Sequence, residues 1–151
     1  MIFDRTQNDV DTAIRLRMEK VQNFQSLTSS EIETMERGMF TINTISRIEN
    51  KQIELKNLFN SMGYWNTPTS NRDFWSVGDI FNIDEFHRII NNLNVLRQAF
   101  FVYKNTPNTP PISYHYNDIN ALEKILHDLD VMINDVKSNY RECGAFVCGE
   151  E

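Results

Sequence analysis

The segment from residue 119 to residue 140 places the strongest constraint on how this chain can fold. Its apolar residues recur at alternating steps of three and four: Ile119, Leu122, Leu126, Leu129, Ile133, Val136 and Tyr140. In an α-helix this spacing forms one narrow stripe, and the positions between are mostly Asp, Glu, Lys and Asn. The pattern predicts a long helix that lies against other helices. It indicates packing or assembly and names no reaction.

The composition is that of a globular domain of ordinary size. The chain has 151 residues, of which 40% are hydrophobic and 24% charged, enough to bury a core and unlike a disordered chain. With 21 acidic and 15 basic residues the net charge is −6, which disfavours general affinity for nucleic-acid phosphates. Five glycines and four prolines argue against a protein of strands and turns. We expect a soluble, mostly helical domain.

The sequence predicts neither a membrane span nor an export signal. Its apolar runs are a few residues long, whereas a span needs about 20. The opening residues 1–8, Met-Ile-Phe-Asp-Arg-Thr-Gln-Asn, lack the apolar core of a signal peptide. We therefore expect no membrane insertion.

The helical pattern covers most of the chain. Long helices are predicted near residues 8–25, 42–62, 83–103 and 117–140, with a short helix that starts within residues 28–33 and ends at Gly38. The expected fold class is all-α: an antiparallel bundle of three long helices, a shorter N-terminal helical region and a short non-helical C-terminal tail. The bundle domain is assigned to residues 1–142 and the tail to residues 143–151.

Helix ends follow from local chemistry. Ser, Thr, Asn and Asp side chains cap helices because they accept hydrogen bonds from the free N–H groups of the first turn. The expected caps are Ser29 or Ser30, Thr41, Asn82 (with Glu85 at the capping-box spacing) and Asn117 or Asp118. Gly63 is expected to end its helix in a left-handed conformation. Three prolines between residues 104 and 111 end the helix before them.

Large aromatic residues mark the connection from residue 64 to residue 81. Trp65 and Trp75 are its largest side chains, and their presence predicts an ordered loop rather than a flexible linker. Tryptophan is enriched at the energetic centres of protein interfaces, so both residues are candidate anchors for a partner. The other interpretation, which is favoured, is that they seal the open end of the bundle.

Residues that could carry chemistry are few. Cys143 and Cys148 are four residues apart with no histidine close by, a spacing that does not predict a metal site. Free thiols, or a disulfide formed after release from the cell, both remain open. Three histidines (His87, His115 and His127) are scattered and are expected at the surface or at its boundary. Three aspartates (Asp128, Asp130 and Asp135) are expected on a solvated helix face.

Sequence motifs for catalysis and for nucleotide binding are missing. The sequence contains no phosphate-binding glycine loop, zinc-protease motif or nucleophile elbow. Its basic cluster, Arg15, Arg17 and Lys20, is interleaved with Asp11 and Glu19 and does not predict a nucleic-acid surface. We assign no catalytic residue, no cofactor and no metal.

The last residues form a different kind of segment. Gly144 is a natural helix terminator, and residues 145–148, Ala-Phe-Val-Cys, are apolar and strand-prone. Such a segment is too short to fold alone, so it lies either on its own bundle or on a neighbouring protein. Docking on a neighbour is the favoured interpretation. The expected contact residues are Trp65, Trp75, Tyr140, Arg141, Cys143, Gly144, Phe146, Val147 and Cys148.

Three stretches, in this order, resemble a family of proteins. The first is Phe-Asp-Arg-Thr-Gln-Asn-Asp-Val at residues 3–10. The second is Thr-Ile-Asn-Thr-Ile-Ser-Arg-Ile-Glu at residues 41–49, followed by Trp-Ser-Val-Gly-Asp at residues 75–79. The third is Tyr-Asn-Asp-Ile-Asn-Ala-Leu-Glu-Lys-Ile-Leu at residues 116–126, followed by Tyr-Arg-Glu-Cys-Gly at residues 140–144 and Gly-Glu at residues 149–150. The chain is similar in these features to small structural proteins encoded among the tail and fibre genes of phages and prophages of low-GC Gram-positive bacteria.

The resemblance implies a non-enzymatic protein of the virion tail, near the baseplate or fibres, that is assembled in the host cytoplasm. Its partners would be other tail, baseplate or fibre proteins, and it would form a homo-oligomer or occur in multiple copies per particle. The family offers no active site to carry over. A second function class is also compatible with an acidic helical chain: a small cytoplasmic inhibitor or regulatory protein that masks a partner.

Overall fold

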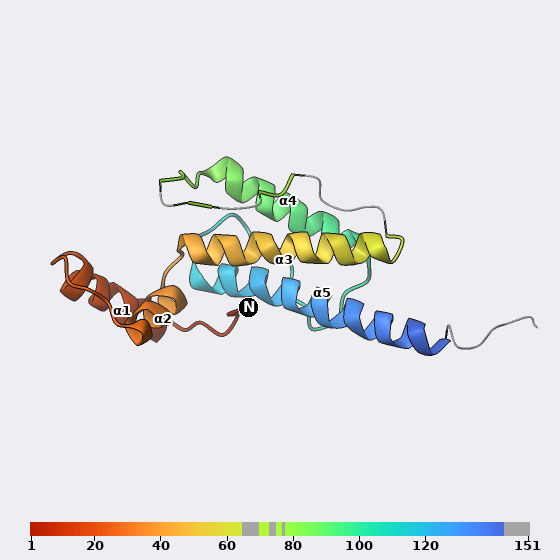
Figure 1. Ribbon diagram of the computed structural model, residues 1–151, viewed down its shortest axis with the longest axis horizontal. Coiled ribbons are helices and arrows are strands. Elements are labelled where there is room, and N and C mark those ends of the chain that lie inside the picture. The colour runs from red at the N-terminus through yellow and green to blue at the C-terminus, as the bar shows by residue number, and fades with distance from the viewer. Residues whose placement is uncertain (65–69, 73–74, 77, 144–151) are drawn as a thin grey trace, which may run out of the picture.

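The computed structural model describes residues 1–64, 70–72, 75–76 and 78–143, with the side chains of residues 140–143 excepted, and this part of the chain contains helices and no strand (Figure 1). The elements are α1 (Gln7–Leu16), η1 (a π-helical turn, Arg17–Val21), α2 (Ser29–Gly38), α3 (Ile42–Ser61), α4 (Ile83–Ala99) and α5 (Tyr116–Cys143). The expected all-α class is confirmed for the described residues.

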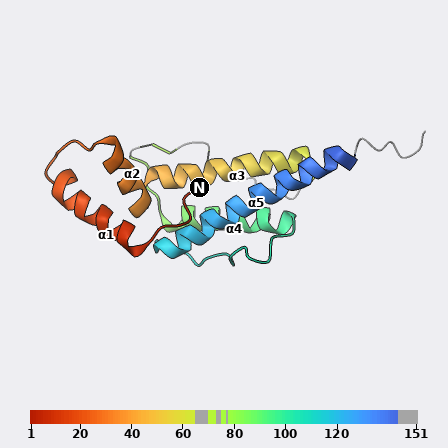
Figure 2. The same cartoon turned by 90° about the horizontal axis from the view of Figure 1, so that it is seen from below.

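The long helices α3 and α5 run in the same direction. Arg47 of α3 pairs with Glu123 of α5 at 2.8 Å, and one turn later Lys51 pairs with Asp130 at 2.9 Å. Residue numbers in the two pairs rise together along both helices, so α3 and α5 are parallel. In antiparallel helices, the residue number would rise along one helix and fall along the other. Figures 1 and 2 show the same direction in two views.

Helix α4 runs in this direction too. Arg88, in the first half of α4, pairs with Glu49 of α3. Phe100, the residue after α4, has its ring centroid 6.3 Å from that of Phe59 near the end of α3. The three long helices thus form a parallel body rather than the antiparallel bundle that the sequence suggested. We call α3, α4, α5 and the connections between them the three-helix body.

The two connections explain why the antiparallel prediction was wrong. Short loops join antiparallel neighbours. Residues 62–82, which we call the first return connection, and residues 100–115, the second return connection, are long enough to bring the chain back to the end of the body where the preceding helix began. Helix α4 has 17 residues and so spans about 25 Å, which about eight extended residues can cover. The second return connection runs along α5 in the opposite direction to that helix, because Tyr103 contacts Asp135 and the later Thr106 contacts the earlier Asp128. Length allowed both topologies, and packing selected the parallel one.

The core of the body comes from one broad face of each helix. The predicted α5 stripe is confirmed by Leu122, Leu126 and Leu129, which are at most 1% exposed. The face is wider than a narrow stripe, since Ile125 and Met132 between the predicted positions are also buried. Val136 is half-buried.

Several predicted helix ends are confirmed. Thr41 caps α3 by accepting a hydrogen bond from the Thr44 N–H, and Asn82 caps α4 by accepting one from the Glu85 N–H. Gly63 ends α3 at φ +85°, the left-handed region that glycine enters without strain.

Other caps differ from the prediction. Thr28, not Ser29 or Ser30, caps α2 in a complete capping box with Glu31. His115 precedes α5, where its Nδ1 accepts a hydrogen bond from the Asn117 N–H, so the cap is neither Asn117 nor Asp118. The Thr28 hydroxyl and the His115 ring nitrogen accept hydrogen bonds from first-turn N–H groups, which is the role predicted for the neighbouring Ser, Asn and Asp side chains.

Helix boundaries are also corrected. The predicted first helix leaves the α-helical path after Leu16 and continues as the turn η1. Helix α4 stops at Ala99 rather than at residue 103, because Phe100 is extended. Helix α5 continues to Cys143, so Cys143 belongs to a helix rather than to a tail. The rest of the predicted tail lies outside the described residues.

The N-terminal hairpin, formed by α1, η1 and α2, lies beyond one end of the body (Figures 1 and 2). Its helices meet closely at Gly38, where an added Cβ would lie 2.1 Å from the Asp9 carbonyl oxygen and 2.5 Å from the Ala13 Cβ. The role of Gly38 is therefore close helix contact.

Candidate functional site

The predicted contact residues fall mostly outside the part of the chain that can be described. Trp65, Gly144, Phe146, Val147 and Cys148 lie outside it. Tyr140, Arg141 and Cys143 belong to the last turn of α5, and their side chains are not described. Their role as contacts stays a prediction.

Trp75 is described and is buried. It is 8% exposed, packs edge-on against Phe81 with ring centroids 5.5 Å apart, and carries the Arg72 guanidinium 4.1 Å above its ring. In the isolated chain Trp75 therefore seals the body and is not exposed as an anchor.

A buried cluster of charges joins the N-terminus to the body. Glu123 of α5 is fully buried. Its Oε2 accepts hydrogen bonds from the Ile2 N–H at 2.9 Å and from Arg5 Nη1 at 2.8 Å, and its Oε1 accepts one from Arg47 Nε at 2.8 Å. Because removal of one partner from a buried ion pair leaves an uncompensated charge, this cluster fixes residues 1–5 against α3 and α5.

A second buried carboxylate, Glu49 of α3, holds α4 and the first return connection. Its Oε2 accepts a hydrogen bond from the Arg72 N–H at 2.7 Å, and both of its oxygens contact Arg88. Burial works against the charge of Arg88, but its hydrogen bonds to Glu49 and Glu85 outweigh this effect and raise its pKa. The arrangement specifies which helix faces which, since a shifted register would leave Glu49 unpaired.

Three aspartates of α5 are paired with protein groups. Asp128, expected on a solvated face, is instead 7% exposed and accepts a hydrogen bond from Thr106 Oγ1 at 2.9 Å. Asp130 pairs with Lys51 at 2.9 Å, and Asp135 accepts a hydrogen bond from the Tyr103 hydroxyl at 2.8 Å. The second return connection thus covers part of the face that the sequence assigned to solvent.

The sequence held a signal for two of these buried groups. Glu49 follows Ile45 by four residues, and Glu123 follows Ile119 by four, so both carboxylates lie in phase with the apolar stripe. A charged residue in that phase is buried if a partner reaches it. The partners, Arg5 and Arg88, are far away in sequence and could not be assigned by spacing.

An apolar surface is exposed on the N-terminal hairpin. Ile14, Met18 and Val21 are 41%, 57% and 42% exposed, and they follow one another by four and three residues on one side of α1 and η1. We call these three residues the hairpin stripe. Phe24, in the connection to α2, is 98% exposed and has φ +56°, a left-handed conformation that is costly for a bulky residue.

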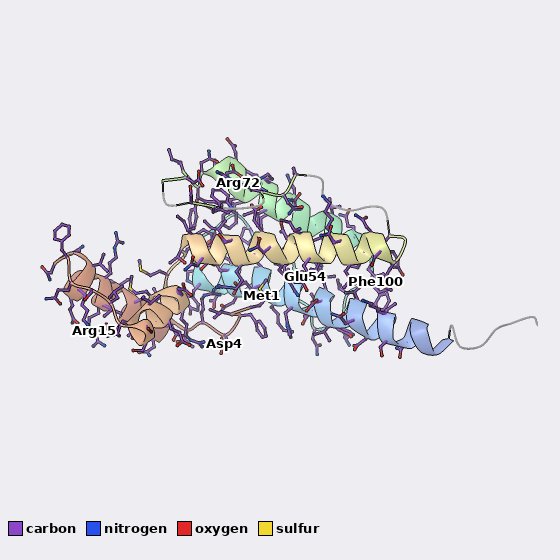
Figure 3. The ribbon with its side chains drawn as sticks, viewed as in Figure 1. Met1, Asp4, Arg15, Glu54, Arg72 and Phe100 are labelled. Carbon is purple, nitrogen blue, oxygen red and sulfur yellow. The ribbon has the colours of Figure 1, made fainter. Side chains whose placement is uncertain are left out.

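Two arginines lie next to the hairpin stripe in the sequence. Arg15 and Arg17 are exposed and form no ion pair with any described residue. Figure 3 shows Arg15 on the hairpin, away from the three-helix body. Lys20, the third member of the basic cluster, pairs instead with Glu31 of α2 and lowers the pKa of that carboxyl to about 2, together with hydrogen bonds from Thr28.

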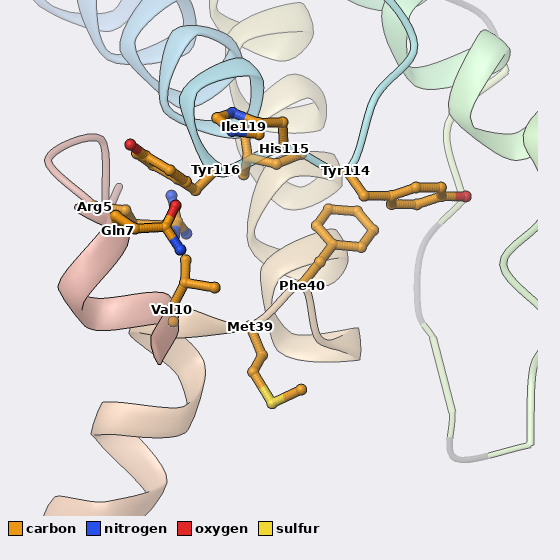
Figure 4. Close-up of a pocket in the computed structure, with 10 residues that line it drawn as sticks. Arg5, Gln7, Val10, Met39, Phe40, Tyr114, His115, Tyr116 and Ile119 are labelled. Atoms are coloured by element: carbon orange, nitrogen blue, oxygen red, sulfur yellow. The ribbon is translucent and has the colours of Figure 1, made fainter. Parts of the chain in front are cut away.

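A cavity of about 240 Å³ lies where the hairpin meets the body (Figure 4). Arg5, Val10, Phe40, His115 and Tyr116 are among its lining residues, so it is bounded by α1, by the α2–α3 junction and by the start of α5. Spacing along the chain does not predict this cavity, because its walls come from three separate parts of the chain.

The described residues do not bring three or more His, Cys, Asp or Glu side chains together as a metal site requires. Among the described helices, none is both long and apolar enough to cross a membrane.

No protein-family model matches the chain, and comparisons with curated proteins and with solved structures give no match either.

Proposed function

We propose that this chain is a non-enzymatic structural protein of a phage particle, placed in the tail, baseplate or fibre region and present in several copies. It connects tail proteins through protein–protein contacts and uses no cofactor, nucleic acid or membrane. The resemblance of residues 3–10, 116–126 and 140–144 to small tail-region proteins supports the class of protein.

The observation that carries the proposal is the exposed apolar surface of the hairpin. A helix that serves only its own fold turns its apolar side inward, whereas Ile14, Met18 and Val21 face solvent. Phe24 adds a fully exposed ring held in an unfavourable backbone conformation. Because this ring contributes no burial and its backbone costs stability, a contact outside the chain accounts for it best.

The proposed occupant is an apolar helical face of a neighbouring tail subunit with an acidic rim. Arg15 and Arg17 border the hairpin stripe without intramolecular ion pairs among the described residues, so they are free to meet carboxylates on a partner. The apolar stripe supplies affinity and the arginines orient the partner.

The C-terminal residues 143–151 provide a second proposed contact, on the strength of their sequence. Deletion of these residues is expected to leave a folded protein with a nearly unchanged melting temperature that no longer enters particles. If the truncated protein is incorporated fully, the tail is not a docking element and the hairpin alone carries assembly.

The hairpin contact is tested by Phe24→Asn, with Gln25→Asn as the neighbouring control. Asparagine tolerates the left-handed conformation, so the melting temperature of Phe24→Asn should be unchanged or higher. Mass spectrometry of purified particles should nevertheless show much less of this variant, and normal amounts of the control. Equal incorporation of the two variants would remove the hairpin from the interface.

The same experiment separates the second function class. A virion protein appears in purified particles at stoichiometric amounts. A regulatory inhibitor is absent from particles and co-purifies with one soluble target, and that result would replace the proposal.

A further inference from the structure

The hairpin and the C-terminal end of α5 lie at opposite ends of the molecule. Gln7 and Val10 of α1 border the same cavity as Tyr116, the first residue of α5, so the hairpin lies beyond the end at which α5 begins. The other end of α5 extends past the end of α3, away from the hairpin (Figures 1 and 2). We call residues 140–151, the last turn of α5 and the residues after it, the C-terminal segment.

The C-terminal segment cannot reach the hairpin of its own chain. Helix α5 has 28 residues, so its two ends lie about 42 Å apart. Residues 144–151, even if fully extended, would span at most about 29 Å. The hairpin stripe lies further away still, beyond the start of α5 (Figure 1). Any contact between these two surfaces is therefore a contact between two copies of the chain.

The two surfaces match in apolar character. The hairpin stripe is about half exposed, and the Phe24 ring beside it is 98% exposed. In the sequence of the C-terminal segment, Tyr140 continues the apolar stripe of α5, and Phe146 and Val147 follow. Each surface thus offers aliphatic and aromatic side chains, and aromatic residues are enriched at the energetic centres of protein interfaces.

The borders of the two surfaces carry groups that can pair. Arg15 and Arg17 form no ion pair with any described residue, and the acids at residues 150–151 follow the apolar part of the C-terminal segment. Asp11 and Glu19 lie on the same helical segment as the arginines, so this border has no net positive charge. The arginines therefore orient a partner through specific pairs, while the apolar contact supplies the affinity.

We propose that the neighbouring subunit at the hairpin is a second copy of this chain, whose C-terminal segment packs on the hairpin stripe and on Phe24. The inference rests on the proposed function, because it gives one partner to both of its contacts. One copy provides the C-terminal segment and the next copy provides the hairpin, so the contact is head to tail. Such a contact leaves one unused surface of each kind on a dimer and extends into a ring or a row of copies.

Sedimentation equilibrium of the full chain tests self-association. The average mass should rise above the 17.8 kDa of one chain with a Kd of about 10–100 μM, as expected for a small contact. Phe24→Asn and Phe146→Asp should each remain monomers with melting temperatures no lower than that of the wild type. Gln25→Asn and Val131→Asp, the latter at a 39% exposed position of α5, are the matched controls and should associate normally.

A wild-type chain that stays a monomer up to about 500 μM, well above the expected Kd, would overturn the inference. The proposed function is judged separately, by incorporation of Phe24→Asn into particles. Reduced incorporation of that variant together with a monomeric wild type would leave the hairpin as a contact for a different protein.

A mixing experiment tests the head-to-tail arrangement. Phe24→Asn retains an intact C-terminal segment, and Phe146→Asp retains an intact hairpin. An equal mixture of the two monomers should form a dimer and nothing larger, because one working contact remains for each pair. If hairpins pair with each other, Phe146→Asp dimerises alone. If C-terminal segments pair with each other, Phe24→Asn dimerises alone. Either result, or a mixture that stays monomeric, would overturn the inference.

Charge reversal tests which groups meet at the border. The double variant Arg15→Glu with Arg17→Glu should associate about fivefold more weakly or worse, and so should Glu150→Lys with Glu151→Lys. A chain that carries all four substitutions should associate about as well as the wild type, because each pair is restored with its charges exchanged. Association of the fourfold variant no better than that of the double variants would overturn the assignment of the C-terminal segment to this surface.

Discussion

The three-helix body and the N-terminal hairpin are both built from amphipathic helices, yet they bury their apolar residues to very different extents. In the body, α3, α4 and α5 each contribute several side chains that are at most 3% exposed. In the hairpin, whose residues are all described, Ala13 is the one buried hydrophobic side chain. The body is therefore stabilised by its own core, while the hairpin leaves much of its apolar surface exposed in the isolated chain.

Polar contacts differ between the two regions as well. Buried carboxylates, Glu49 and Glu123, hold the body together through arginines from distant segments. The hairpin is joined by partly exposed pairs, such as Lys20 with Glu31 and Arg37 with Asp9. Since ion pairs that water can reach contribute about 0–1 kcal/mol, the hairpin is expected to open before the body unfolds.

The largest expected effect comes from matched charge insertions in the two regions. Leu126→Asp places a carboxylate at a fully buried position of α5, which should cost about 4 kcal/mol or more and abolish the cooperative thermal transition. Ile14→Asp, at a 41% exposed position of α1, should change the unfolding free energy by less than about 1 kcal/mol. Comparable losses from both variants in chemical denaturation would show that the hairpin stripe is buried in solution.

The next effect tests the buried charges of the body. Glu123→Gln leaves Arg5 and Arg47 without a countercharge and should destabilise the protein by about 3–5 kcal/mol. Glu54→Gln alters an acid of α3 that is 62% exposed, and a change below about 0.5 kcal/mol is expected for this control. Urea denaturation measures both. If Glu123→Gln is as stable as the control, the cluster does not hold the N-terminus.

A smaller effect is expected from Gly38→Ala, which acts on the hairpin. The new Cβ would overlap the Asp9 carbonyl oxygen, and such overpacking costs about 1–3 kcal/mol. Hydrogen exchange should speed up in residues 7–38 and stay unchanged in α3 and α5. Glu33→Ala, at an exposed position of α2, provides the control. Loss of protection throughout the molecule would show that hairpin and body unfold as one unit.

The smallest effect is a pH dependence of the hairpin. The pKa of Glu31 is lowered from 4.5 to about 2 by Lys20 and Thr28. Because its folded pKa lies below the unfolded value, the stabilisation is complete above about pH 4.5 and is lost as the pH falls towards about 2. Hydrogen exchange of α2 should therefore accelerate in this window, and Glu31→Gln should flatten the profile between these two pH values. An unchanged profile in the variant would assign the acid sensitivity to another group.

Sequence reasoning succeeded where a property is local. The caps Thr41 and Asn82, the left-handed Gly63 and the buried positions Leu122, Leu126 and Leu129 all follow from spacing and side-chain chemistry within a few residues. It failed for Asp128, which looks like a surface residue on its helix but is covered by Thr106 from the second return connection. The cavity was missed for the same reason, since Arg5, Phe40 and Tyr116 meet only in the folded chain.

The sequence by itself determined the all-α class, the positions of the helices within a few residues and most of the apolar faces, because the 3.6-residue period ties each of these to neighbouring residues. The tertiary structure decided the rest. It set the parallel direction of α3, α4 and α5, because long connections permit either direction and only contacts between distant segments, such as Arg47 with Glu123 followed by Lys51 with Asp130, distinguish them. It also decided that Ile14 of α1 stays exposed while the apolar face of α5 is buried, since burial depends on which distant segments pack against a helix and not on its own sequence alone.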